Sequence, residues 1–71
     1  MNKKQLGKIL HKARIEKEYT RKEVAEMLKV THDTVCKWES GKLTPRVGKL
    51  VKLEIILDTK ILTDEFIEQV Q

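Results

Sequence analysis

The 71-residue sequence has one cysteine, one proline and only three aromatic residues. A single cysteine cannot form a disulfide within the chain, so the fold must hold together without a covalent crosslink, as is usual in a reducing compartment. The longest apolar run is Ile55–Leu57, far short of the roughly 20 residues that cross a bilayer. The N-terminus also lacks the apolar stretch of a signal peptide. We therefore expect a cytoplasmic protein with no membrane segment.

What the sequence does contain is charge and aliphatic side chains. Charged residues make up 37% of the chain, so the core must come from Leu, Ile, Val and Ala on helical faces, with the charges outside. A chain of this length forms one small domain, here residues 1–71, and buries only about 60% of its unfolded surface. This composition favours a soluble all-α domain with little room for a deep catalytic pocket.

The charge is unevenly distributed along the chain. Residues 1–52 hold 14 Lys and Arg against 6 Asp and Glu, a net charge of +8, whereas residues 53–71 hold 1 against 5, a net charge of −4. A polyanion is the natural partner of the basic part. A solvated basic face with no partner is the alternative.

Apolar spacing and capping signals predict the first two helices. Residues 5–17 show apolar side chains at three- and four-residue spacing, which is typical of an amphipathic helix. Thr20 and Glu23 form a capping box, in which each side chain satisfies a free backbone N–H, and it opens a second helix at about residues 21–28.

Three further helices are expected. Thr31 is an N-cap for a helix at about residues 32–39, which ends at Gly41. Thr44-Pro45 repeats the start signal for a fourth helix, and a short C-terminal helix is expected at about residues 64–70. The side chains predicted to face the core are Leu6, Ile9, Leu10, Ala13, Val24, Ala25, Leu28, Val35, Trp38, Val47, Leu50, Val51, Leu53 and Leu57.

Two helices of about eight residues joined by a three-residue turn form a helix-turn-helix. The run TRKEVAEMLKVTHDTVCKWESGKLTPRVGKLVKL combines this arrangement with a hydroxyl residue opening the second helix, Glu three positions later, and Trp-Glu-x-Gly-x-x-x-Pro at the end. From Leu6 to about Leu57 the sequence resembles the phage repressor and Cro family of DNA-binding domains. The resemblance implies a compact five-helix, lambda-repressor-like fold and regulation of transcription, most often repression by occluding a promoter.

The third helix of this family reads DNA bases from its outer face. With Val35 and Trp38 inward, the positions that match the family's base contacts are His32, Asp33 and Lys37. Lys37 can donate to guanine, His32 can donate to a purine acceptor, and Asp33 can accept from the cytosine amino group. The alternatives are that Asp33 only caps the helix dipole and pairs with Lys37, and that Lys37 contacts phosphate.

Phosphate contacts are expected at helix ends, where free N–H groups and the dipole attract anions. By resemblance, Arg21 occupies a position where the family often has Gln gripping the DNA backbone, so a charged donor replaces a neutral one. The other candidates are Thr31, Lys42, Thr44 and Arg46. Ordinary solvation of the loop is the alternative for Lys42 and Arg46.

The resemblance also implies a largely buried ion pair between Arg14 in the first helix and Glu39 at the end of the third. Two separate surface charges, which contribute at most about 1 kcal/mol even when paired, are the alternative. Glu39 follows Trp38 on the inward side of its helix, which favours the buried pair.

Catalysis and metal binding have weak support. His32, Asp33 and Cys36 are the residue types of a hydrolytic triad, but Asp33 points away from the other two and no Gly-rich loop supplies an oxyanion site. As metal ligands, His32 and Cys36 provide two of the four that structural zinc needs, and His11 is the only other histidine. We expect no enzyme activity, metal or cofactor.

The expected partner is double-stranded DNA, bound as a homodimer. One reading helix covers half a site, and specific binding normally uses two-fold symmetry. The acidic, apolar-striped residues 61–71 are the candidate contact between copies; packing over the chain's own helices is the alternative. Two other functions remain open, a protein–protein adaptor that keeps the fold and the DNA-binding portion of a longer protein. The cations Arg21, Lys37, Lys42 and Arg46 argue against the adaptor.

Overall fold

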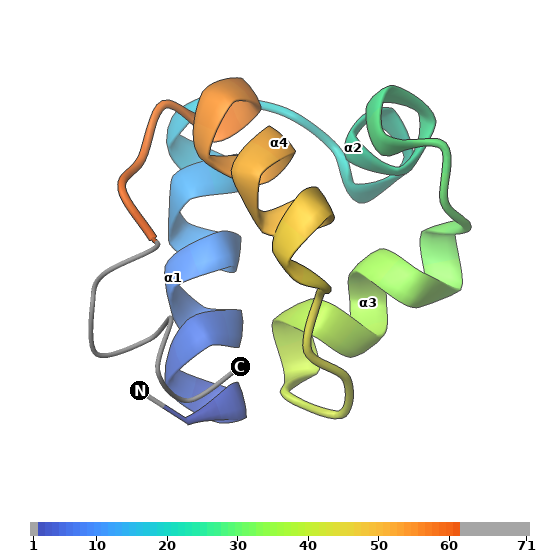
Figure 1. The fold of residues 1–71 in the computed structure, drawn as a ribbon. Coiled ribbons are helices and arrows are strands. Elements are labelled where there is room, and N and C mark those ends of the chain that lie inside the picture. Colours follow the sequence, from blue (N-terminus) through green and yellow to red (C-terminus); the bar gives the residue numbers. More distant parts are fainter. Residues whose placement is uncertain (1, 62–71) are drawn as a thin grey trace.

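A computed structural model describes residues 2–61 of the chain, and over these residues the regular structure is entirely helical. The helices are α1 (Lys3–Glu16), α2 (Arg21–Leu28), α3 (His32–Ser40) and α4 (Val47–Leu57), coloured in chain order in Figure 1. The expected fifth helix, at residues 64–70, lies outside the described residues. None of the helices from residue 2 to residue 61 is long and apolar enough to span a membrane.

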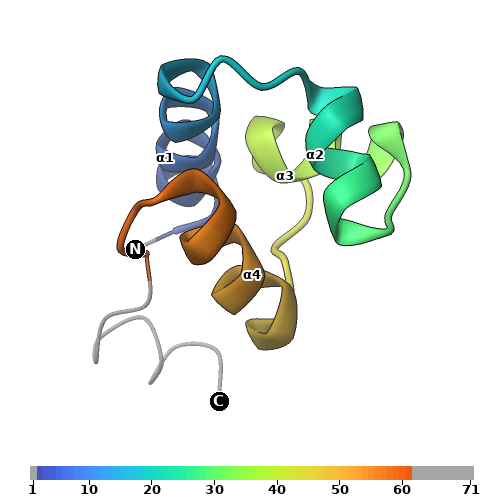
Figure 2. The same cartoon turned by 90° about the horizontal axis from the view of Figure 1, so that it is seen from above.

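The four helices surround one apolar core. Helix α3 packs against α1 and α2, and α4 crosses over and contacts the same two helices (Figures 1 and 2). The buried hydrophobic side chains are Leu6, Leu10, Ala13, Val24, Ala25, Leu28, Val35, Trp38, Leu50, Leu53, Leu57 and Ile61. The predicted inward residues of α2 and α3 are all among them, and Ile9 is partly buried against them.

Helix α1 begins two residues earlier than the apolar spacing predicted. Asn2 is its N-cap: the Asn2 side chain accepts from the N–H of Gln5 at 2.8 Å, and the Gln5 side chain accepts from the N–H of Asn2 at 3.0 Å. This is a capping box built from amides. The periodicity prediction missed it because residues 2–5 contain no apolar side chain.

The predicted start of α4 at Thr44-Pro45 is wrong. Pro45 is buried and lies before the helix, whose N-cap is Arg46 with φ −70° and ψ 159° and no side-chain capping bond. A residue that precedes proline is pushed toward extended backbone. Pro45 is therefore buried in the extended connection between α3 and α4 instead of opening the helix.

Two predicted core residues of α4 are exposed. Val47 and Val51 are each 44% exposed, and Ile55 is 75% exposed. Successive helical residues turn by about 100°, so with Leu50, Leu53 and Leu57 inward, Val51 and Ile55 fall on the opposite side. The predicted buried stripe was too wide, because seven of the eleven residues of this helix are apolar and they lie on more than one side of it.

The connection from α2 to α3 is short and anchored. Lys29 ends α2 in the left-handed conformation, with φ 58° and ψ 43°, and the N–H of Val30 donates to the carbonyl of Ala25 at 2.9 Å. The ammonium of Lys49 on α4 donates to the carbonyl of Leu28 at 2.7 Å. A lysine at the C-terminal end of a helix satisfies a free carbonyl and complements the dipole, so this contact fixes α4 against the turn that orients α3.

Candidate nucleic-acid interface

The outer face of α3 presents polar side chains while its inner face is anchored in the core. Val35 and Trp38 are 2% and 4% exposed, whereas His32, Asp33 and Lys37 are exposed. Thr31 caps the helix by accepting from the N–H of Thr34 at 3.1 Å. The three predicted base-contacting residues are therefore accessible on a helix whose orientation is set by its buried side.

Asp33 and Lys37 form an ion pair on this face. The Lys37 ammonium lies 3.0 Å from a carboxylate oxygen of Asp33, at i,i+4 spacing, and the two side chains are 50% and 73% exposed. An exposed pair of this kind contributes only a few tenths of a kcal/mol. Little free energy is therefore needed to separate the two side chains, and both stay available to a partner.

The structure does not assemble a hydrolytic triad from His32, Asp33 and Cys36. The Cys36 sulfur lies 3.7 Å from Nδ1 and 3.8 Å from Nε2 of His32, but Asp33 turns to Lys37 instead of orienting the imidazole. Within residues 2–61, no three His, Cys, Asp or Glu side chains gather as a ligand set for a metal ion. These contacts make His32 and Cys36 part of the surface of α3.

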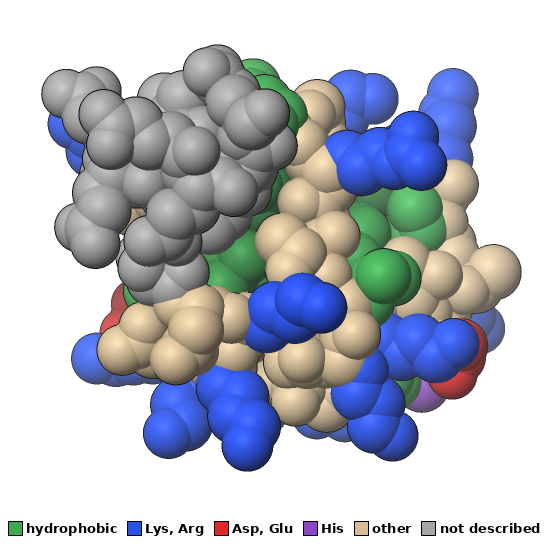
Figure 3. Space-filling model, turned by 60° about the horizontal axis from the view of Figure 1, so that its bottom comes forward, with side chains coloured by type: hydrophobic (Ala, Val, Ile, Leu, Met, Phe, Trp, Pro, Cys, Tyr) green, Lys and Arg blue, Asp and Glu red, His purple; other side chains and the backbone are tan. Residues whose placement is uncertain are grey.

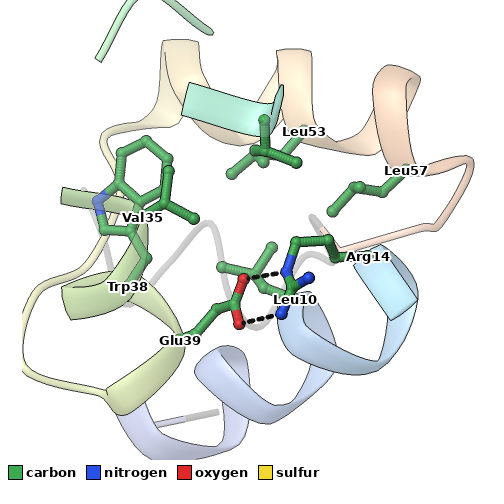
Figure 4. A pocket seen from close by; sticks show the side chains of 8 residues that line it. Leu10, Arg14, Val35, Trp38, Glu39, Leu53 and Leu57 are labelled. Carbon is green, nitrogen blue, oxygen red and sulfur yellow. Dashed lines mark hydrogen bonds and ion pairs between the residues drawn. The ribbon is translucent and has the colours of Figure 1, made fainter. Parts of the chain in front are cut away.

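The cavity inside the apolar core of residues 2–61 is too small for a substrate. A small cavity of about 10 Å³ lies among Leu10, Val35, Trp38, Leu53 and neighbouring side chains (Figure 4). A cavity of this volume holds at most about one water molecule. Its wall also contains the facing side chains of Arg14 and Glu39 (Figure 4).

Arg14 and Glu39 join α1 to α3 as a two-point ion pair. Nε of Arg14 donates to Oε2 of Glu39 at 2.7 Å, and Nη2 donates to Oε1 at 3.1 Å. The side chains are 7% and 6% exposed. Nη1 of Arg14 also donates to the carbonyl of Tyr19 at 2.8 Å, so the guanidinium additionally fixes the loop that leads into α2.

Two more basic side chains contact Glu39, and neither contact was predicted from the sequence. Nδ1 of His11 lies 2.8 Å and Nε of Arg21 lies 3.2 Å from Oε1 of Glu39. A carboxylate only accepts, so both nitrogens donate. The spacing of His11, one helical turn before Arg14 on the same face, was the available signal. Nothing in the sequence pattern placed Arg21 beside Glu39.

These contacts set the ionisation of Glu39. Burial alone would raise the pKa of Glu39, but hydrogen bonds from Arg14 and His11 and the positive charges of Arg14 and Arg21 outweigh burial and lower its pKa below the ordinary value. The carboxylate therefore stays ionised well into the acidic range. Its ionised form binds the surrounding cations, so its folded-state pKa is linked to stability.

The lowered pKa predicts acid sensitivity. The stability that ionised Glu39 contributes is complete above the pKa it has in the unfolded chain, and it is lost as pH falls through the lower folded-state value. We expect the stability difference between the wild type and Glu39→Gln to be constant near neutrality and to shrink as the pH falls below the ordinary range of a glutamate carboxyl and through its lowered folded-state pKa. Urea titrations followed by Trp38 fluorescence measure it. A difference that stayed constant down to pH 2 would contradict the assignment.

The predicted phosphate-contacting residues lie around α3. Arg21 and Thr31 stand at the N-terminal ends of α2 and α3, and Lys42, Thr44 and Arg46 occupy the connection between α3 and α4. Thr44 is half-buried, whereas Thr31, Lys42 and Arg46 are exposed. Figure 3 shows Lys and Arg side chains scattered over the face of the molecule that it presents, with few acidic ones.

Three features together define a helix-turn-helix protein. They are the short turn between α2 and α3, the polar outer face of α3 and the cations at the surrounding helix ends. A family model described as Helix-turn-helix matches residues 10–63, about three-quarters of the 71 residues. The chain belongs to this family, and the match confirms the resemblance to repressor and Cro-type domains. The family is one of DNA-binding regulatory domains that are generally not enzymes. No curated protein sequence matched the chain.

Proposed function

We propose that this protein is a sequence-specific regulator of transcription that binds double-stranded DNA and inserts α3 into the major groove. The observation that carries the proposal is the outer face of α3, where His32, Asp33 and Lys37 are exposed while Val35 and Trp38 anchor the helix from behind. The major groove of B-DNA admits one α-helix, and its base edges offer donors and acceptors to such side chains.

Each of the three residues has a complementary base edge. Lys37 donates to O6 and N7 of guanine, Asp33 accepts from the amino group of cytosine, and His32 donates to a purine acceptor. The ion pair between Asp33 and Lys37 has to loosen as the bases replace it. Because the pair is exposed, this exchange costs little. We expect the preferred site to contain G·C pairs facing the middle of α3.

Phosphate contacts orient the helix in the groove and supply most of the salt-dependent affinity. We assign them to residues at the helix ends and in the connection to α4. They are Arg21, Thr31, Lys42, Thr44 and Arg46.

We further propose that the protein binds as a homodimer and represses by occluding a promoter. One α3 covers half a site, and two-fold dimers read half-sites about one helical turn apart. The acidic residues 61–71, with apolar side chains at helical spacing, are the part of the chain least attracted to DNA. Sedimentation of the complex with a palindromic site should show two protein copies per duplex. A single copy at saturation would contradict the dimer.

Titration of a fluorescent mixed-sequence duplex at low and high salt tests the proposal. Non-specific binding should weaken steeply with salt, because each neutralised phosphate releases about 0.9 counterion. Selection from a random DNA pool should then give a two-fold consensus. Absence of salt-sensitive binding at any protein concentration would refute the DNA function and favour a protein–protein adaptor.

Two alanine variants should separate base contacts from phosphate contacts. Asp33→Ala should relax sequence preference at one base pair, where a good contact gives about 1–3 kcal/mol of discrimination. Lys42→Ala should weaken binding to all sequences alike and lower the salt slope by about one. Affinities for the selected site and its single-base variants measure both effects. If Asp33→Ala instead tightens binding uniformly, Asp33 acts only by capping α3 and holding Lys37.

A further inference from the structure

Arg21 is held at one edge of its guanidinium and open at the other. Its Nε donates to Oε1 of Glu39 at 3.2 Å, and the side chain is 41% exposed. Among the described residues, its two terminal nitrogens have no protein partner. A guanidinium has five N–H donors in a planar fork, so the edge formed by the terminal nitrogens remains able to bind a phosphate with two parallel hydrogen bonds.

The Glu39 carboxylate that binds Arg21 is itself anchored by other contacts. Arg14 binds both oxygens of the Glu39 carboxylate, and the Glu39 side chain is only 6% exposed. An arginine fixed by one edge loses less rotamer freedom when its other edge binds. Glu39 therefore lowers the entropic cost of using Arg21.

The charge balance around Glu39 favours an anion. Two guanidinium groups, from Arg14 and Arg21, face one carboxylate, and His11 adds a third donor. Only Arg21 of the two arginines reaches the surface, because Arg14 is buried. The unbalanced positive charge of the cluster is therefore presented at Arg21.

The cluster adjoins the reading helix. Arg21 and His32 line the same shallow surface groove, together with Glu18, Tyr19, Thr20, Lys22 and neighbouring side chains. A phosphate bound by Arg21 would lie at the N-terminal end of α3, beside the first base-contacting candidate.

We propose that Glu39 is a positioning residue for DNA binding: it fixes Arg21 by Nε so that the two terminal nitrogens grip a backbone phosphate beside His32. This inference rests on the proposed DNA-binding function. It gives the buried ion pair a role in addition to stability, because one carboxylate joins α1 to α3 and orients a phosphate-binding side chain of α2. It also explains how a charged residue can bind phosphate at the start of α2, because the Glu39 carboxylate holds the Arg21 guanidinium in one orientation.

A thermodynamic cycle on DNA affinity tests the coupling. Arg21→Ala, Glu39→Gln and the double variant are titrated with a mixed-sequence fluorescent duplex, at a temperature where circular dichroism shows each to be folded. Glu39→Gln should weaken binding several-fold when Arg21 is present and should have no further effect when combined with Arg21→Ala. A purely structural role would give the same loss in both backgrounds and would overturn the proposal. Lys22→Ala, at the neighbouring exposed cation, is the control, and its effect should multiply with that of Glu39→Gln.

Arg21→Lys tests the same idea without touching the buried pair. Lysine keeps the charge but is a point donor that cannot bind Glu39 with one edge and phosphate with the other. We expect about tenfold weaker binding, close to the loss in Arg21→Ala. Wild-type affinity in Arg21→Lys, or in Arg21→Ala, would overturn the positioning role while leaving DNA binding intact. Failure of the wild type to bind any duplex would instead refute the proposed function itself.

Discussion

Glu39→Ala should lose about 3–5 kcal/mol of unfolding free energy, because removing one member of a buried ion pair leaves the other charge buried without compensation. Arg14, only 6% exposed, would keep its bond to the Tyr19 carbonyl but lose both bonds to the carboxylate. A domain of this size has a total stability of about 4–10 kcal/mol. The variant should therefore lose a large part of the stability of the domain.

Urea unfolding measures this loss directly. Trp38 is the only tryptophan of the chain and is 4% exposed, so its fluorescence reports loss of the core. Glu26→Ala removes an exposed carboxylate from α2 and serves as the control, with an expected change within about 0.5 kcal/mol. Adding Arg14→Met to Glu39→Ala should restore part of the stability, since the stranded charge is removed. A loss below about 1 kcal/mol in Glu39→Ala would show that the pair is not buried in solution.

The elements that the sequence located well are those with paired local signals. Helix α2 begins where Thr20 and Glu23 cap each other, at 3.0 and 2.9 Å, and α3 begins at the Thr31 cap and ends at Gly41, whose φ is 82°. In each case a capping side chain and an apolar period point to the same boundary. The start of α4 was predicted wrongly, because Thr44-Pro45 has the residue types of a helix start, whereas Pro45 is buried before the helix begins.

The contacts between the side chains of the site were harder to predict from the sequence than the position of the site. The outer residues of α3 follow from the inward Val35 and Trp38, since helical periodicity fixes both faces at once. The contact between Arg21 and Glu39 does not follow from any spacing, because the two residues are 18 positions apart and meet only when α2 packs against α3. The same holds for the bond from Lys49 to the carbonyl of Leu28. Local signals therefore place side chains on a face, and tertiary packing decides which of them share a partner.

Tight approach between α1 and α3 is the feature that makes the Glu39 cluster possible. Gly7 of α1 is buried, and a Cβ built there would lie 2.5 Å from the carbonyl oxygen of Glu39 and 2.8 Å from that of Trp38. Both atoms belong to the backbone of α3, so a rotamer change cannot relieve the overlap. Glycine at this position lets the last turn of α3 lie directly on α1, which brings the Glu39 side chain within reach of Arg14.

Gly7→Ala should therefore destabilise the domain by about 2 kcal/mol. Forcing α1 and α3 apart costs up to about 3 kcal/mol, and the better helix propensity of alanine offsets roughly 0.5–1 kcal/mol of that cost. Gly48→Ala is the matched control, because Gly48 lies in α4 with nothing within 4 Å of the added Cβ. There the propensity gain stands alone, and we expect stabilisation of roughly 0.5–1 kcal/mol. Opposite signs in urea unfolding would locate the effect in the helix contact; a gain in both variants would mean that α1 and α3 are not so closely packed.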